Sequence, residues 1–235
     1  MKTGKLYLIP VKLGPEGRIS DIPQHTIDVA IELKSFFVER EKSARAALKE
    51  FGLKTSQSDI ELFDIGKHGQ QQGFDEQLMR CFSGEDLGLL SEAGAPAVAD
   101  PGSRVVSEAQ AMGVEVVPLV GPSSILMALM ASGMNGQNFA FQGYVPIQKN
   151  ERRSFLKRLQ SFIERDDQTQ ILIETPYRVQ NLLEELSSHL SPKIQVCLAM
   201  NLGLPNEKIE KRSAADWKGE KLREKKPLAV FVIGH

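Results

Sequence analysis

The chain has 235 residues, of which 41% are hydrophobic and 25% are charged, and its net charge at pH 7 is -1. This balance is typical of a globular protein and excludes both a disordered chain and a strongly basic one, so contact with nucleic acid would require a local basic patch. The length allows one large α/β domain or two small ones.

Short apolar runs alternate with amphipathic stretches in the first half, which predicts crossover units on a largely parallel sheet. The predicted strands are residues 5–10, 35–39, 60–64, 86–91 and 114–118. The predicted helices are residues 25–33, 42–51, 74–82 and 103–112. The last of these helices has clear end signals, because Ser103 can cap its start and Gly113 follows its end.

Gly121 and Pro122 interrupt the chain before the apolar helix ILMALMASG, and we expect a domain boundary there, giving domains 1–119 and 120–235. The predicted strands of the second half are residues 138–144, 169–174, 194–200, 207–212 and 228–234. Its predicted helices are residues 150–165 and 176–190. The short turn NLGLPN between two of the strands makes part of this sheet antiparallel. The predicted fold is therefore two α/β domains, mainly parallel in the first and mixed in the second.

The remaining global features predict a cytoplasmic protein without a membrane segment. The apolar run SSILMALMASG is too short to span a bilayer, and MKTGKLYLIPVKLG lacks a signal-peptide core. Cys81 and Cys197 lie in separate apolar segments with no metal-binding spacing, so we expect buried free thiols and no metal site.

Three loops rich in Gly, Pro and small residues follow predicted strands: VKLGPEGRIS, SEAGAPAVADPG and VGPSS. Ligands of open α/β sheets bind beyond the carboxyl ends of the strands, so these loops should converge on one ligand site. The sequence lacks the G-x-G-x-x-G dinucleotide turn and the Gly-Lys-Ser/Thr of a phosphate-binding loop. Each loop taken singly could be a plain tight turn, but three such loops at the same sheet edge favour a ligand of another kind.

Four segments together resemble the tetrapyrrole-methylase superfamily of S-adenosylmethionine (SAM) dependent methyltransferases. They are SEAGAPAVADPGSRVV, VVPLVGPSSILMALMASG, FAFQGYVP and ETPYR. The chain looks most similar to the bacterial branch that methylates a cytidine ribose 2′-hydroxyl in small-subunit ribosomal RNA. The resemblance covers nearly the whole chain.

The resemblance implies two α/β domains with SAM in the cleft between them, a homodimer and no metal. The residues that it places at the SAM are Pro10, Gly94, Ala95, Pro96, Ser123, Ser124, Asn201 and Pro227.

The sequence departs from the family on the presumed substrate side. The usual T-P-I-G-N-L-G-D loop is VKLGPEGR here, and E-D-T-R is replaced by Glu39-Arg40-Glu41-Lys42. The family's S-D-A-G becomes S-E-A-G, with Glu92 in place of the aspartate. SAM binding is therefore better supported by the sequence than an RNA substrate is.

A ribose hydroxyl is a weak acid, so its methylation benefits from a nearby base or cation. The candidate catalytic residues are Glu39, His68 and Glu92, with Lys67 as a candidate cation. Glu39 could equally cap a helix or pair with Arg40 or Lys42, and His68 could be a solvated loop histidine.

The stretch NERRSFLKRLQSFIERDD forms a basic amphipathic helix with the apolar residues Phe155, Leu159 and Phe162. A solvated helix face is one interpretation of its charges, and phosphate contact is the other. The candidate phosphate contacts are Arg152, Arg153, Lys157, Arg158 and Arg165.

Three functions remain open at this point. The first is SAM-dependent 2′-O-methylation of ribosomal RNA, with the RNA or ribosomal subunit as partner. The second is SAM-dependent methylation of a small molecule such as a tetrapyrrole. The third is a non-catalytic SAM-binding or interaction protein of the same fold, which the altered first loop and the replaced E-D-T-R favour.

Overall fold

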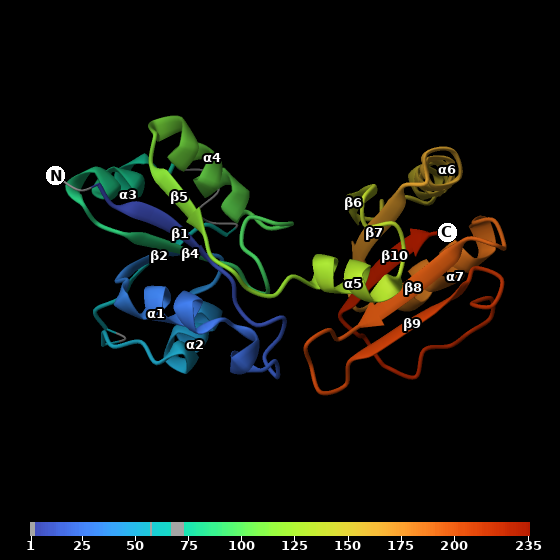
Figure 1. Cartoon of the computed structure of the whole chain (residues 1–235), viewed down its shortest axis with the longest axis horizontal. Coiled ribbons are helices and arrows are strands. Elements are labelled where there is room, and N and C mark those ends of the chain that lie inside the picture. The colour runs from blue at the N-terminus through green and yellow to red at the C-terminus, as the bar shows by residue number, and fades with distance from the viewer. Residues whose placement is uncertain (1–2, 57, 67–72) are drawn as a thin grey trace. The chain divides into compact units, whose positions relative to one another are not determined.

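The computed structural model of the chain describes residues 3–56, 58–66 and 73–235. The chain forms two compact units, residues 1–123 and 124–235, and each unit has one five-stranded sheet (Figure 1). The boundary expected after residue 119 falls in the segment that follows the last strand of the first unit.

The sheet of the first unit is entirely parallel, with the strand order β3-β2-β4-β1-β5. Its strands are β1 (Lys5–Ile9), β2 (Ser35–Val38), β3 (Glu61–Asp64), β4 (Leu87–Leu90) and β5 (Glu115–Pro118). Every residue of β2 and β4 is buried, as expected for continuous apolar strands covered on both faces. The predicted parallel sheet is confirmed.

Helices cover both faces of this sheet, and Figure 1 shows α1 and α2 on one face and α3 and α4 on the other. The α-helices are α1 (Gln24–Glu32), α2 (Glu41–Phe51), α3 (Asp75–Met79) and α4 (Gly102–Met112). Short 3-10 turns occupy Ile19–Asp21 and Arg80–Ser83. Alternate residues of β2 enter different cores, with Phe36 facing α1 and α2 and Phe37 facing α3 and α4.

The second unit has a mixed sheet with the order β6-β7-β10-β8-β9, and its mixed character is as predicted. Its strands are β6 (Phe139–Tyr144), β7 (Thr169–Glu174), β8 (Gln195–Met200), β9 (Lys208–Ser213) and β10 (Ala229–Gly234). The strands β6 and β7 are parallel, whereas β10 runs antiparallel to both β7 and β8. The carboxyl ends of β6, β7 and β8 therefore share one edge with the start of β10.

Three helices complete this unit: α5 (Ser124–Ser132), α6 (Lys149–Asp166) and α7 (Val179–His189). The core lies between the sheet and α6 and α7, and α5 packs against β8, β9 and β10. Trp217 is buried in this core, where its indole Nε1 donates to the carbonyl of Val196 over 2.8 Å.

The cap predicted for one helix and the start predicted for another were wrong. Asp100, rather than Ser103, satisfies the start of α4, because its carboxylate accepts from the amide of Gly102 over 2.8 Å. The helix predicted from residue 176 begins at Val179, because residues 175–178 form a turn with a 2.9 Å hydrogen bond from the Arg178 amide to the Thr175 carbonyl.

Cys81 and Cys197 are free and buried, as predicted. Burial raises the pKa of the Cys81 thiol to about 11. Within the residues that the structure describes, none of the helices is long and apolar enough to cross a membrane.

Candidate active site

The loops that follow β1 and β4 are joined at the carboxyl edge of the first sheet. Val11 and Gly94 form an antiparallel bridge, in which the Val11 amide donates to the Gly94 carbonyl over 3.0 Å and the Gly94 amide returns a bond over 3.1 Å. The Ser91 hydroxyl also donates to the Gly94 carbonyl, over 2.8 Å. The convergence predicted for these two loops is confirmed within this unit.

Gly94 is needed for this close approach. Its φ is +71°, and a Cβ atom there would lie 3.0 Å from Leu13 Cδ2 and 3.3 Å from the Pro122 carbonyl oxygen. The loop after β5, which contains Pro122, therefore lies against the same glycine. Because the amide and carbonyl of Gly94 both bond to Val11, this residue fixes the three loops and does not present its own backbone groups to a ligand.

The β4 loop carries backbone strain that the sequence did not predict. Ala97 and Ala99 have φ values of 64° and 60°, a region that costs a residue with a Cβ about 1–2 kcal/mol. The carboxylate of Asp100 holds this conformation by accepting from the Ala97 amide over 2.9 Å and from the Gly102 amide. Strain of this kind clusters at ligand sites, and here it lies next to the predicted SAM contacts Ala95 and Pro96.

Pro10 is buried at the end of β1, against the loop that follows β5. A Cβ atom on Gly121 would lie only 2.3 Å from Pro10 Cβ, so glycine is required there. The Thr26 hydroxyl of α1 holds the same loop through a 2.7 Å bond to the Val120 carbonyl. Ser123 is the last residue of the first unit, and Ser124 begins α5 in the second.

Three carboxyl groups lie around the ends of β2 and β4. Burial raises the pKa of Glu39, and the neighbouring charges of Asp100 and Glu92 raise it further, while the Glu92 amide and Arg40 oppose the change. Burial also raises the pKa of Asp100, against the effect of its two backbone hydrogen bonds. A half-buried carboxylate with a raised pKa suits a general base, and the cluster suits a cationic ligand.

Glu92 is more exposed than Glu39 and has its own partners. The Ser43 hydroxyl donates to Glu92 Oε1, and Arg40 Nε lies 3.9 Å from Glu92 Oε2. Arg40 thus pairs with Glu92, so the ion pair that the sequence suggested between Glu39 and Arg40 is at most indirect. His68 and Lys67 lie outside the described residues.

Glu92 also lines a pocket of about 420 Å³ between the loops and α2. Its lining residues are Val11, Lys12, Gly14, Pro15, Arg40, Lys42, Ser43, Ala46, Ala47, Glu50, Phe51, Ser91 and Glu92. The floor is apolar, and Lys12 Nζ at the wall is 2.6 Å from Glu50 Oε2. The volume lies in the range of about 300–1,000 Å³ that small ligands occupy.

In the second unit, Asn201 joins the loop after β8 to the start of β10. Asn201 is buried with φ 52°, its amide donates to the Leu228 carbonyl over 2.8 Å, and its Oδ1 accepts from the Leu228 amide over 2.9 Å. These bonds bring Asn201 beside Pro227, another SAM contact predicted in this unit. Asn201 also lines a cavity of about 440 Å³ with Met200 and Arg212.

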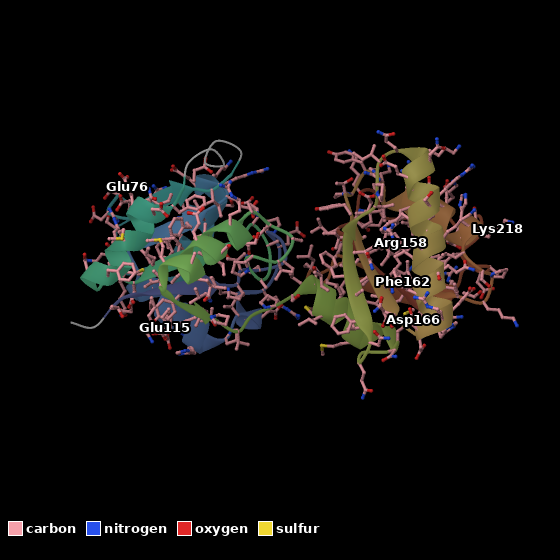
Figure 2. The ribbon with its side chains drawn as sticks, turned by 90° about the horizontal axis from the view of Figure 1, so that it is seen from above. Glu76, Glu115, Arg158, Phe162, Asp166 and Lys218 are labelled. Atoms are coloured by element: carbon pink, nitrogen blue, oxygen red, sulfur yellow. The ribbon has the colours of Figure 1, made fainter. Side chains whose placement is uncertain are left out.

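The basic helix α6 offers fewer free cations than its sequence predicted. Arg152 Nε lies 2.6 Å from Glu185 Oε2 of α7, Arg165 pairs with Asp166, and Arg158 lies over the Phe155 ring at 5.5 Å. Figure 2 labels Arg158, Phe162 and Asp166 along this helix. Arg153, Lys157 and Arg158 are exposed, and the buried stripe includes Leu156 and Ile163 rather than Phe162.

A family model described as Tetrapyrrole (Corrin/Porphyrin) Methylases matches residues 33–217. The chain belongs to the tetrapyrrole methylase family. The resemblance inferred from the sequence motifs is therefore confirmed, and the chain is an enzyme of the SAM-dependent methyltransferase class.

Curated relatives of this tetrapyrrole methylase carry the name "Ribosomal RNA small subunit methyltransferase I". The protein from Escherichia coli O157:H7 is 30% identical over 99% of this chain and 78% of its own length. The protein from Vibrio cholerae serotype O1 is 30% identical over 97% of this chain and 76% of its own length.

Solved structures confirm the two-domain α/β fold. The methyltransferase CobJ superposes with a TM-score of 0.65 at 19% identity and covers 99% of this chain and 95% of its own. The uroporphyrin-III-C-methyltransferase of Thermus thermophilus gives a TM-score of 0.57 at 18% identity, over 100% of this chain and 93% of its own.

Proposed function

We propose that the chain methylates the ribosomal RNA of the small subunit at a ribose 2′-hydroxyl, with SAM as methyl donor. The names of relatives that are 30% identical over nearly the whole chain support the RNA substrate. The chemistry rests on one observation: the carboxyl group of Glu39 is half-buried, and burial and the charges of Asp100 and Glu92 raise its pKa.

SAM supplies a methyl group that its sulfonium already activates, so the protein has to position the acceptor and remove its proton. Bound SAM would supply the methyl group to the hydroxyl oxygen and leave as its demethylated product, and the Glu39 carboxylate would take the hydroxyl proton. Glu92 contributes negative charge and lines the neighbouring pocket, which we assign to the acceptor nucleotide. His68 stays a candidate base.

The residues that would hold SAM are the ones that the family motifs indicate. In the first unit they are Pro10, Ala95, Pro96 and Ser123, with Gly94 holding their loops together, and in the second they are Ser124, Asn201 and Pro227. The fit rests on the carboxyl cluster, whose negative potential favours a sulfonium, while Gly94 and Gly121 let the loops that carry these residues pack closely together.

A small-molecule acceptor such as a tetrapyrrole is the second candidate. It is favoured by the description of the matching family and by the uroporphyrin-III-C-methyltransferase that superposes on the chain. The non-catalytic alternative loses its support, because the matching family and relatives are methyltransferases. A cytoplasmic homodimer remains our expectation, and sedimentation equilibrium would measure the oligomeric state.

The deciding experiment offers tritiated SAM and the purified chain to small ribosomal subunits from cells that lack the protein. A 2′-O-methyl group blocks alkaline cleavage of the adjacent phosphodiester, so the label should appear in alkali-resistant dinucleotides. Label in ordinary mononucleotides would mean base methylation and would contradict the ribose assignment. Label only in a tetrapyrrole-containing extract would replace RNA by a small-molecule acceptor.

A further inference from the structure

An exposed tyrosine stands on a rigid turn at the carboxyl edge of the second sheet. Tyr177 lies in the turn between β7 and α7, and 75% of its surface is exposed. A single exposed aromatic side chain is ordinary, but one that shares its edge with further exposed side chains marks a candidate contact surface.

The turn is fixed by the buried carboxylate of Glu174, whose side chain is only 1% exposed. Glu174 Oε1 accepts from the Thr175 amide over 2.7 Å, and Glu174 Oε2 lies 3.0 Å from Arg178 Nη2. Arg178 neutralises the carboxylate, so this acid does not repel an anion nearby. The exposure of Tyr177 is therefore built into the turn.

A lysine covers part of the Tyr177 ring. Lys226 Nζ lies 4.5 Å from the ring centroid, within the range of a cation–π contact. Lys226 has φ 60°, so its backbone adopts the less favourable left-handed conformation in this position. Arg223 and Lys225 of the same segment are also exposed, and its one acid, Glu224, accepts from Asn206 Nδ2 over 3.1 Å.

Two further exposed side chains lie at the same edge. Tyr144 at the end of β6 is 57% exposed and Ile147 is 78% exposed. Arg178 Nη2 donates to the Val145 carbonyl over 3.3 Å, which ties the segment between them to the Tyr177 turn. The edge thus combines aromatic surface with a run of positive charge.

We propose that Tyr177 and Lys226 form a stacking platform for an unpaired base of the substrate RNA, with the adjacent phosphates near Lys225 and Arg223. Single-stranded nucleic acid is bound by this combination of exposed aromatic rings and cations. The inference rests on the proposed function, because it requires RNA as the substrate. The positive charge favours RNA over a second copy of the chain, whose matching edge would repel it.

The test compares Tyr177→Ala, Tyr177→Phe and Lys226→Asn in the full chain. Asparagine removes the charge of Lys226 yet tolerates its left-handed backbone. Fluorescence anisotropy with a labelled single-stranded oligoribonucleotide of mixed sequence measures affinity. We expect Tyr177→Ala to weaken binding about tenfold and Tyr177→Phe to leave it within about twofold, since base stacking needs the ring and not the hydroxyl. Lys226→Asn should weaken binding and reduce its salt dependence.

Methyl transfer to small subunits gives a second readout. Tyr177→Ala should raise the KM for the subunit with kcat and SAM affinity unchanged. Unchanged oligonucleotide affinity and KM would overturn the platform, even with the wild type fully active on RNA. A wild type that neither binds nor methylates RNA would overturn both this inference and the proposed function. If Tyr177→Ala sediments with a different mass from the wild type while its RNA affinity is unchanged, the edge is a protein interface instead.

Discussion

Glu39 directly follows β2 with its carboxyl group half-buried, so its charged form is less well solvated than that of a surface glutamate. The charges of Asp100 and Glu92 disfavour ionisation further, and together these effects raise its pKa above the ordinary value of 4.5. A raised folded-state pKa means that ionised Glu39 lowers stability at neutral pH, because its stabilising contribution is present only at low pH and is lost as pH rises.

Glu39→Gln should therefore lower methyl transfer by about 100-fold or more while leaving stability at pH 7 equal or higher. The wild-type rate should fall as the pH drops through the raised pKa, because protonated Glu39 cannot accept the hydroxyl proton. This acid limb should be absent from the residual activity of the variant. Measuring kcat against pH with saturating SAM, for the wild type and for Glu39→Gln, tests whether the acid limb is lost.

A matched variant separates this role from that of its neighbour. Glu92→Gln should raise the KM of the acceptor more than it lowers kcat, because Glu92 lines the pocket. If Glu92→Gln instead removes the acid limb and Glu39→Gln keeps it, the base is Glu92.

Gly94→Ala tests the joined loops. We expect a loss of stability of about 3 kcal/mol, which combines the left-handed backbone with a Cβ at 3.0 Å from Leu13 Cδ2. Gly113→Ala is the control, because Gly113 has φ +79° and open space around it, so only the backbone cost of about 1 kcal/mol applies. Urea unfolding measures the stability of both variants. Equal losses of stability would show that the close packing of Leu13 and Pro122 against Gly94 is unimportant.

Some candidate residues can be predicted from the sequence next to them, and others depend on contacts or backbone conformations that the sequence does not signal. Glu39 and Glu92 were predicted because each follows an apolar strand, and a strand end can be read from composition alone. The role of Asp100 could not be predicted, because it depends on the left-handed backbone of Ala97 and Ala99, a conformation that alanine does not signal. The hydrogen bonds of Asn201 to Leu228 join residues far apart in sequence and leave no local pattern.

At the scale of elements, α6 shows why a charge pattern overstates a binding surface. Its sequence offers several cations at helical spacing. In the structure, however, Arg152 forms an ion pair with Glu185 of α7, and Arg165 forms one with Asp166 at the end of α6. The partner of Arg152 lies on another helix, so the sequence of α6 alone could not reveal it. Arg158 is exposed but lies over the Phe155 ring, so Arg153 and Lys157 remain as the exposed pair without that contact.

Reversing both exposed charges, Arg153→Glu with Lys157→Glu, should weaken binding to small ribosomal subunits and reduce the slope of log affinity against log salt by about 1.5–2. Stability should change little. Arg152→Ala is the contrasting variant, and it should lower the free energy of unfolding because Glu185 loses its partner. A filter-binding titration at several salt concentrations measures the slope, and an unchanged slope would assign α6 to a solvated face.

The ten strands and seven longer helices of the prediction all appear. Most are apolar or amphipathic runs punctuated by Gly, Pro or charged residues, and the charged strand β9 is marked instead by the short turn before it. The misplaced cap of α4 and the misplaced start of α7 have one cause. Side chains outside the helix, Asp100 in one case and Glu174 in the other, decide where the helical hydrogen bonds begin.

For the whole molecule, hydrophobic patterning was sufficient to predict a parallel sheet and a mixed one. It could not give the strand orders, because β3-β2-β4-β1-β5 and β6-β7-β10-β8-β9 depend on which crossovers pack best. The family motifs supplied what patterning could not, namely candidate SAM contacts in both units.

If residues of both units hold one SAM, substitutions in either unit should weaken the same binding event. We expect Gly94→Ala in the first unit and Asn201→Ala in the second each to weaken SAM binding about tenfold, equivalent to roughly 1.4 kcal/mol. Asn201→Ala should do so because it removes the bond to the Leu228 amide and places alanine at φ 52° beside Pro227. Calorimetric titration of the full chain with SAM measures both affinities.

Gly113→Ala and Gly219→Ala serve as the controls of the two units, since each glycine has a positive φ and a Cβ atom added to it would meet nothing within 4 Å. Both controls should bind SAM as the wild type does, which separates a local effect from general loss of stability. Wild-type affinity in Asn201→Ala together with a weakened Gly94→Ala would confine the ligand to the first unit. The second unit would then contribute through its Tyr177 edge alone, and the family motif around Asn201 would be explained by its hydrogen bonds to Leu228.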